Sequence, residues 1–285
     1  LNDPIPFLNK VIVPDSEANF NRFESEIIKK IQNGERILSP QEEKLIIGGE
    51  ATMWTEHVSP ETIDSRLWPR TAAIAERLWS PENIRDVDDM YRRLDIISIQ
   101  LEWLGSTHIK NKQMMLRRLA RTEDINVLEN VVDYIEPVKG YKRNNANNFT
   151  KYSPYSLLVD VAAPDPSSLR KFNKLLDTLI INPSDILLEK LYQQLYLWDS
   201  NHDIIQKMAY KNLLLKDLLT HSTSLQVISS RSIELLNLKK KGLAASPEQI
   251  KQYKDLIKKS LVPAGYCELS LGLNLEKFIL DYCQK

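Results

Sequence analysis

Two side chains that could contact a sugar, Trp54 and Glu56, lie close together in the segment GGEATMWTEHV, residues 48–58. A further carboxylate, Glu50, precedes them in the same segment. The flat face of an indole stacks on the C–H face of a sugar ring, and a carboxylate accepts hydrogen bonds from sugar hydroxyl groups. The residues alone leave a second interpretation open, in which a structural Trp stands beside a surface Glu.

A short strand is the element expected to position these side chains. Residues 44–54, KLIIGGEATMW, form an apolar run without helical periodicity, and the two glycines allow close backbone packing. Alternate side chains share one face of a strand, so Trp54 and Glu56 would point the same way and His57 would point away. If the strand belongs to a (β/α)8 barrel, its C-terminal end meets the active-site mouth, with Glu50 lying deeper.

Amphipathic helices are expected along most of the remaining chain. One is predicted over residues 67–79, and a second over residues 87–104 carries an apolar stripe with spacings of three and four. Beyond residue 106 the sequence predicts almost only helices, packed as a bundle. The longest stretch covers residues 202–240, with a break expected near residues 221–224.

Composition argues against several classes of function. Lys plus Arg equals Asp plus Glu at 38 each, so no bulk charge favours nucleic acid. No apolar run approaches the roughly 20 residues that span a bilayer. The four histidines show no i, i+4 spacing, and the two cysteines, Cys267 and Cys283, fit neither a metal motif nor a disulfide framework. We therefore expect no metal and no cofactor.

The segments GGEATMWTEHV, RLWPRTAAIAERLWS and DMYRRL resemble the end of the catalytic barrel in family 20 glycoside hydrolases, the β-N-acetylhexosaminidases. Members carry G-G-E-x-x-x-W-x-E on the last barrel strand, followed by a W-P-R-x-x-A-x-A-E-R-x-W helix. The resemblance covers residues 1–105 and nothing specific in 106–285. It implies a mainly α chain: a C-terminal slice of a (β/α)8 barrel, with its last strand and helix, then a helical bundle-like domain at residues 106–285.

The same resemblance implies roles for individual residues. Trp54 matches the Trp in the aromatic wall of the −1 sugar pocket, and Glu56 matches the Glu that hydrogen-bonds O4 and O6 of that sugar. Glu50 is expected to be a buried structural carboxylate held by Arg70 or Arg77, because a buried charge needs a partner. Four further residues are expected to pack or to start the helix: Trp68, Pro69, Glu76 and Trp79.

No catalytic residue is expected in this chain. Family members hydrolyse terminal N-acetylhexosamine with retention, using the substrate's own acetamide as nucleophile. An Asp that orients the acetamide and an adjacent Glu acid lie in an H-x-G-G-D-E motif, which this sequence lacks, since no Asp precedes Glu50. The chain also begins without Met, in what reads as the middle of a loop. We expect the inactive C-terminal portion of a β-N-acetylhexosaminidase, whose partners are a glycan with terminal N-acetylhexosamine and the N-terminal part of the enzyme.

Two points stay open at this stage. The compartment is undetermined by the residues, and the resemblance suggests a periplasmic or secreted protein. The alternative to an enzyme portion is that residues 106–285 are a non-catalytic structural module or mediate a homodimer. A carbohydrate-binding module is disfavoured, because the one Trp in that region, Trp198, lies on an apolar helical stripe.

Overall fold

The computed structural model describes residues 26, 29–30, 33–34, 38–55, 57–140, 142–145, 149–150, 152–153 and 155–284. The chain forms two compact units, residues 1–52 and residues 53–285. In the first unit, helix α3 covers Pro40–Glu43. It starts with a capping box: the Ser39 hydroxyl accepts from the Glu42 amide, and the Glu42 carboxylate accepts from the Ser39 amide at 2.7 Å.

Three helices open the second unit. They are α4 (Ile63–Leu67), α5 (Arg70–Trp79) and α6 (Val87–Trp103). The Asp86 carboxylate caps α6 by accepting from the Asp89 amide at 3.0 Å, and Gly105 ends the segment with φ of 101°. The helix predicted over residues 87–104 is confirmed, whereas the one predicted over 67–79 starts three residues later, at Arg70.

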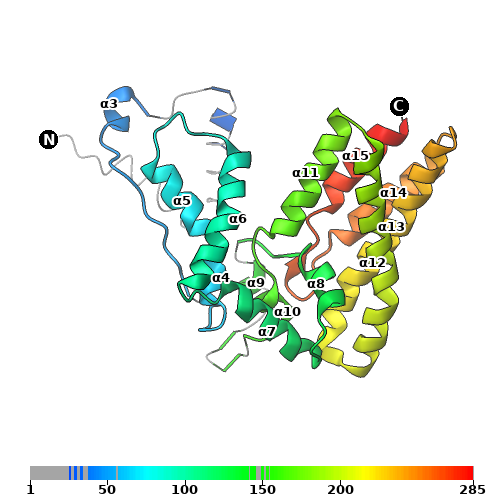
Figure 1. The fold of residues 1–285 in the computed structure, drawn as a ribbon, viewed down its shortest axis with the longest axis horizontal. Coiled ribbons are helices and arrows are strands. Elements are labelled where there is room, and N and C mark those ends of the chain that lie inside the picture. Colours follow the sequence, from blue (N-terminus) through cyan, green and yellow to red (C-terminus); the bar gives the residue numbers. More distant parts are fainter. Residues whose placement is uncertain are drawn as a thin grey trace. The chain divides into compact units, whose positions relative to one another are not determined.

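The rest of this unit is a bundle of helices, as the sequence predicted (Figure 1). Along the chain they are α7 (His108–Ala120), α8 (Asn126–Val132), α9 (Lys142–Asn145), α10 (Leu158–Val161), α11 (Ser167–Ile181), α12 (Asp185–Lys211), the 3₁₀ turn η1 (Leu213–Leu215), α13 (Lys216–Lys240), α14 (Pro247–Ser260) and α15 (Gly272–Gln284). Strand β1 (Glu136–Pro137) pairs antiparallel with β2 (Cys267–Glu268). None of the helices described is both long and apolar enough to cross a bilayer.

The hydrophobic core lies among α7–α15. At its centre the rings of Tyr134, Phe172 and Trp198 meet edge to face, with centroids 4.7–5.9 Å apart. The Trp198 indole N–H donates to the Asn130 carbonyl at 3.0 Å, so its one polar atom is satisfied. Of the predicted stripe Leu188, Leu191, Leu195 and Trp198, the last three are fully buried and Leu188 is half-buried.

The break in the long helical stretch lies at residues 212–215 and not at 221–224 as expected. Asn212 ends α12: its side-chain oxygen accepts from the Leu214 amide, and its NH₂ donates to the Leu119 carbonyl at 2.9 Å. An Asn side chain competes with the backbone for hydrogen bonds, which favours a helix end. Helix α13 runs unbroken through residues 221–224, where His221 and Ser222 are buried.

The strand expected over residues 44–54 does not form. Residues 46–55 have no regular secondary structure, and Ile46 and Ile47 are exposed. A strand is stable only beside another strand that pairs its backbone N–H and C=O groups. Among the residues described, the β1–β2 pair is the one sheet present, so the segment has no pairing partner there. The barrel slice and the domain boundary at residue 105 stay predictions.

Candidate functional site

Trp54 stands at the surface of the second unit, with 72% of its area exposed. The preceding Met53 is half-buried, so the two neighbours have opposite surroundings. An exposed indole is open for stacking by a ring-shaped ligand. Glu56, the second residue predicted to contact sugar, lies outside the described residues.

The chain beyond Trp54 is held by a tight local turn. The Val58 amide donates to the Thr55 carbonyl, and the Ser59 amide donates to the Thr62 hydroxyl at 2.9 Å. Thr62 is completely buried and its amide donates back to the Ser59 carbonyl at 3.0 Å. Short polar side chains that bond neighbouring backbone groups stabilise such turns. The turn therefore fixes the path by which the chain leaves the exposed Trp and enters α4.

Helix α7 anchors the next residues. The Arg118 guanidinium pairs with both oxygens of the Glu61 carboxylate at 2.7 and 2.9 Å, and the Asn111 NH₂ donates to the Glu61 carbonyl at 3.0 Å. The Asp64 carboxylate accepts from the amide and hydroxyl of Thr107 at 2.6 and 2.9 Å. These bonds lower the pKa of Asp64, chiefly through the Thr107 amide, and the Arg118 contact lowers the pKa of Glu61.

A second group of contacts reaches His57 from the connector between β1 and α10. The Phe149 ring meets the His57 imidazole edge to face at 4.5 Å, and Tyr155 lies 6.4 Å from the same imidazole. The Arg143 guanidinium lies 5.3 Å from the Phe149 ring and 5.8 Å from the Tyr155 ring. His57 is half-buried as a result. Its predicted direction relative to Glu56 stays a prediction.

A buried ion pair fixes this aromatic group. Arg143 donates to the Asp160 carboxylate at 2.8 Å, and the Asp160 side chain is fully buried. The same carboxylate accepts from the Leu157 amide at 2.9 Å. Arg66, at the end of α4, donates to the carbonyls of Val159 and Ala162 at 2.9 Å each. Helix α4 and the connector are thus tied together around α10.

The three residues predicted to be structural have described positions. Glu50 is exposed in the first unit. Arg70 donates to the Arg66 carbonyl at 2.6 Å, and burial lowers its pKa. Arg77 donates to the carbonyls of Ile84 and Pro81 and thereby closes the turn between α5 and α6. The pairing of Glu50 with either arginine stays a prediction.

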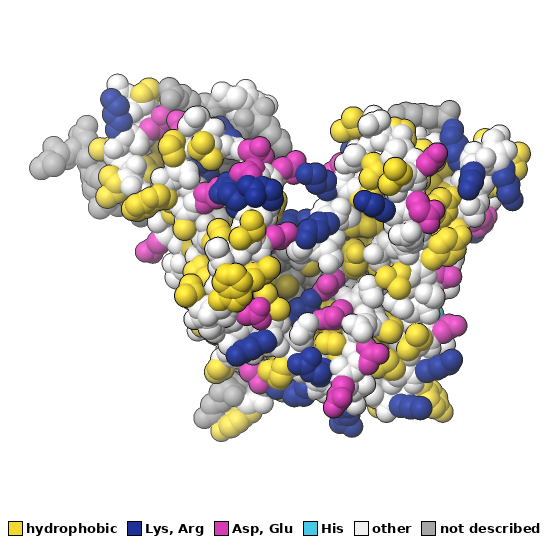
Figure 2. All heavy atoms as spheres, in the orientation of Figure 1, with side chains coloured by type: hydrophobic (Ala, Val, Ile, Leu, Met, Phe, Trp, Pro, Cys, Tyr) yellow, Lys and Arg dark blue, Asp and Glu magenta, His cyan; other side chains and the backbone are white. Residues whose placement is uncertain are grey.

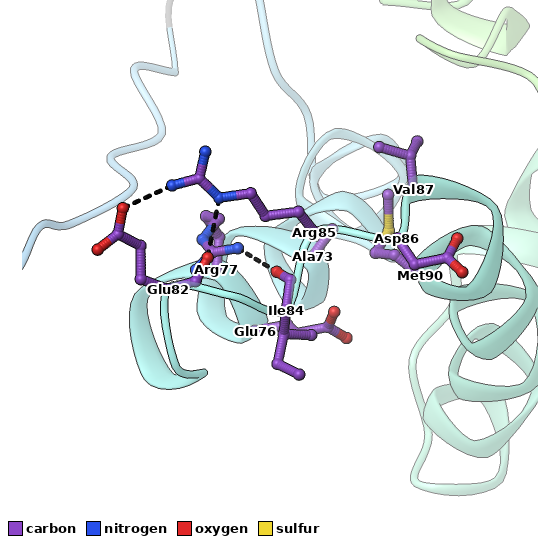
Figure 3. Close-up of a pocket in the computed structure, with 9 residues that line it drawn as sticks. All are labelled: Ala73, Glu76, Arg77, Glu82, Ile84, Arg85, Asp86, Val87 and Met90. Atoms are coloured by element: carbon purple, nitrogen blue, oxygen red, sulfur yellow. Dashed lines mark hydrogen bonds and ion pairs between the residues drawn. The ribbon is translucent and has the colours of Figure 1, made fainter.

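A cavity of about 520 Å³ lies at that turn (Figure 3). Its charged residues already have protein partners: Glu82 pairs with Arg85 at 2.7 Å, and Glu76 is held by Arg93. The cavity thus lacks the open pair of carboxylates that general acid–base chemistry on a sugar requires. Nor do the described residues contain a cluster of His, Cys, Asp and Glu that could hold a metal ion. We therefore regard the cavity as structural.

Helices α5 and α6 and the turn between them leave several large apolar side chains exposed, a set that we call the α5–α6 face. Figure 2 shows hydrophobic side chains at the surface over these helices. The face consists of Ile74, Leu78, Trp79, Ile84, Val87, Ile96, Ile99, Trp103 and Leu104, each between 44% and 93% exposed. The prediction that Trp79 packs is wrong for this chain, since it is the most exposed of the set. Apolar surface of this extent marks an interaction surface.

Sequence reasoning missed the connector residues Arg143, Phe149 and Tyr155. The run KGYKRNNANNFTKYSPYS was interpreted only as a polar, Asn-rich connector. Its signal was the presence of aromatic residues in an otherwise polar loop, because aromatics in loops need a surface to pack on. The contact with His57 spans more than 90 positions, and no local pattern encodes such a distance.

Comparison with known proteins places part of the chain in a family. Residues 13–82 match the model of the glycosyl hydrolase family 20 catalytic domain. The beta-hexosaminidase subunit beta of Felis catus is 50% identical over 58 residues, which are 20% of this chain and 11% of that protein. The probable beta-hexosaminidase fdl of Drosophila melanogaster is 45% identical over 73 residues, 24% of this chain and 11% of that protein.

The helical region also has a structural counterpart. The X-ray structure of Flavobacterium johnsoniae chitobiase superposes with a TM-score of 0.77 at 37% identity, over 85% of this chain and 36% of that one. The covered 85% of the chain is far longer than residues 1–105. The structural similarity therefore extends well into residues 106–285, where the sequence alone suggested no relative.

The chain spans about a tenth of the curated relatives' length and about a third of the chitobiase. The motif residues Gly48 to Trp79 all lie inside the matched segment. Through this segment the chain is similar to part of the catalytic domain of glycosyl hydrolase family 20.

Proposed function

We propose that this chain is the C-terminal portion of a retaining β-N-acetylhexosaminidase that removes terminal N-acetylhexosamine from glycans. In this proposal Trp54 and Glu56 bind the terminal sugar, and the catalytic Asp–Glu pair comes from the remainder of the catalytic domain. The observation that carries the proposal is the exposed indole of Trp54 inside the family 20 segment.

The chemistry of the two side chains differs. Trp54 offers a flat apolar face to the C–H groups of the sugar ring, which positions the ring and excludes water from that side. Glu56 accepts hydrogen bonds from O4 and O6 and thereby fixes the rotation of the ring. Cleavage uses the substrate's acetamide as nucleophile and a protonated Glu for the leaving oxygen, groups that this chain does not supply.

The α5–α6 face supports the idea of a larger catalytic domain. Amphipathic helices of a (β/α)8 barrel pack their apolar side against the strands. Helices α5 and α6 have such a side, and much of it is exposed in this chain, as Trp79 at 93% and Trp103 at 78% illustrate. Strands of the same barrel would also pair with residues 44–54, which have no sheet neighbour among the residues described.

Two assays test the proposal. The first measures release of p-nitrophenol from p-nitrophenyl N-acetyl-β-D-glucosaminide by the 285-residue chain, and we expect none. The second uses a chimera in which this chain replaces the corresponding part of the Flavobacterium johnsoniae chitobiase. There we expect turnover, and Trp54→Ala should lower kcat/KM by about a hundredfold through lost ring burial. Turnover by the chain alone, or an active chimera indifferent to Trp54→Ala, would overturn the proposal.

The alternative for residues 106–285 is a structural role, which one observation favours. The contacts of Arg118, Asn111 and Thr107 with the Glu61–Asp64 turn show a helix of that region supporting the segment after Trp54. A buttressing role is therefore compatible with the enzyme proposal. Dimerisation is a separate possibility, and light scattering of the purified chain decides it: a monomer at 100 µM, on the order of typical weak-dimer constants, would argue against it.

A further inference from the structure

The connector between β1 and α10 brings an aromatic group against the segment that carries Trp54. Phe149 lies edge to face on His57 at 4.5 Å, and His57 is three residues from Trp54. Three residues of chain span at most about 11 Å, so a group that fixes His57 acts at the edge of the proposed sugar site. Phe149 also lies 6.0 Å from Tyr266 beside β2, which connects the group to the helical bundle.

The contacts behind Phe149 are buried ones. Arg143 is 7% exposed and pairs with the fully buried Asp160. Its Nε and second terminal nitrogen have no hydrogen-bond partner among the described residues, and its guanidinium faces the Phe149 and Tyr155 rings instead. A cation over aromatic rings gains electrostatic stabilisation when it is shielded from water. Moving Phe149 would therefore remove one of the aromatic rings that shield this buried cation, while its ion pair with Asp160 remains.

Phe149 and helix α7 both belong to the region of residues 106–285. The segment after Trp54 is fixed twice from that region: α7 holds Glu61 and Asp64, and the connector holds His57. The α7 contacts are ion pairs and hydrogen bonds at residues 61–64. The connector contacts of Phe149 and Tyr155 reach His57, three residues from the indole.

We propose that Phe149 is a positioning residue for sugar binding: by packing on His57, three residues after Trp54, it helps to hold the Trp54 indole where it receives the terminal N-acetylhexosamine. The inference rests on the proposed function. It assigns residues 106–285 a part in substrate affinity. Phe149 itself touches neither the sugar nor the reacting atoms, and acts through His57.

The structural part of the proposal is tested on the chain as it is. Hydrogen–deuterium exchange with mass spectrometry is measured for peptides covering residues 53–62. Phe149→Ala should accelerate their exchange about tenfold, the factor that corresponds to losing one aromatic pair, while Phe149→Tyr keeps the ring and the slow rate. Tyr152→Ala, at an 82% exposed position of the same connector, is the matched control and should change nothing.

Two results would overturn this part. One is unchanged exchange over residues 53–62 in Phe149→Ala. The other is equal acceleration in α12 and α13, because that would mean global loosening instead of a local effect.

The functional part uses the chimera with the chitobiase. Phe149→Ala should raise KM for p-nitrophenyl N-acetyl-β-D-glucosaminide about tenfold with kcat within about threefold, and Phe149→Tyr should restore KM. Trp54→Ala in the same chimera separates the two hypotheses. If Trp54→Ala has an effect and Phe149→Ala has none, positioning by Phe149 is wrong and the proposed function stands. If Trp54→Ala also has none, the proposed function is wrong.

Discussion

Helices α4–α6 and helices α7–α15 are built from similar amphipathic sequences, but they differ in how far their apolar side chains are buried. In α7–α15 the apolar stripes are buried, as at Leu191, Leu195 and Trp198. In α4–α6 Leu94 is the one buried large apolar residue among those described. Met90, Ile97 and Leu101 of its stripe are half-buried, and Leu104 at the end is 85% exposed. An apolar stripe thus shows that a helix has a partner, but not that the partner lies in the same chain.

The contrast explains which region can fold around its own core. The second region supplies helices on all sides of Trp198 and Phe172, so packing satisfies the pattern locally. The first region leaves large side chains in water, where each fails to gain about 1.5–3 kcal/mol of burial energy. We infer that α7–α15 stabilise this chain, and that α5 and α6 depend on packing against something else.

The largest expected effect comes from a pair of tryptophans, one in each region. Trp198→Ala removes a ring that is 1% exposed and that contacts Tyr134 and Phe172, so the free energy of unfolding should fall by about 4 kcal/mol. Trp79→Ala removes a ring that is 93% exposed, so the free energy of unfolding should change by less than about 0.5 kcal/mol. Urea denaturation followed by circular dichroism measures both. Equal losses of unfolding free energy in the two variants would contradict the difference between the two regions.

A smaller effect is expected from a charge on the α5–α6 face. Leu78 is 51% exposed in this chain, so Leu78→Lys should leave the unfolding free energy within about 0.5 kcal/mol. In the chimera, where the remaining catalytic domain would cover this face, the same change should cost about 2 kcal/mol because it buries a charge without a partner. Thermal melting of the two proteins gives the two values.

Lys190→Glu on α12 is the control for a charge change at an exposed position of the other region. Its effect on thermal melting should be the same in the chain and in the chimera. A loss for Leu78→Lys that is the same in both proteins would show that the remaining domain does not cover the α5–α6 face.

The sequence predicted helices well and long-range contacts poorly. The stripe over residues 87–104 has a local period, so its helix forms as expected. The strand over residues 44–54 depends on neighbouring strands, and the apolar run alone cannot supply them. The helix break was predicted near residues 221–224, where a run of Ser and Thr lies in a buried helix that continues unbroken. It lies at Asn212 because the Asn212 side chain accepts a hydrogen bond from the nearby Leu214 amide and thereby ends the helix.

The candidate site shows the same limit. The family resemblance pointed to Trp54, and that residue proves to be exposed. Nothing local indicated that Phe149 would lie on His57, or that Arg118 would pair with Glu61, since these partners are 92 and 57 residues apart. Such contacts depend on how the helices pack, and that packing is encoded by the whole core.

The smallest effect concerns Asp64, which joins the two regions through Thr107. Its pKa is lowered from the usual 3.8, first by the hydrogen bond from the Thr107 amide. A carboxylate whose pKa is lower in the folded than in the unfolded protein stabilises the fold above its unfolded pKa, and this contribution disappears as the pH falls through the folded pKa. Asp64→Asn should therefore melt at a lower temperature than the wild type at pH 6, and the gap should close below about pH 4.

The control for this prediction is Asp88→Asn on α6, an exposed carboxylate that pairs with Lys174 at 2.8 Å. Exposed pairs contribute little, so this variant should follow the wild type at every pH. Thermal melts from pH 2 to pH 7 compare the three proteins. A gap for Asp64→Asn that persists at the lowest pH would mean that Asp64 acts by shape alone. The two regions would then be joined here by packing, and the charge of the carboxylate would play no part.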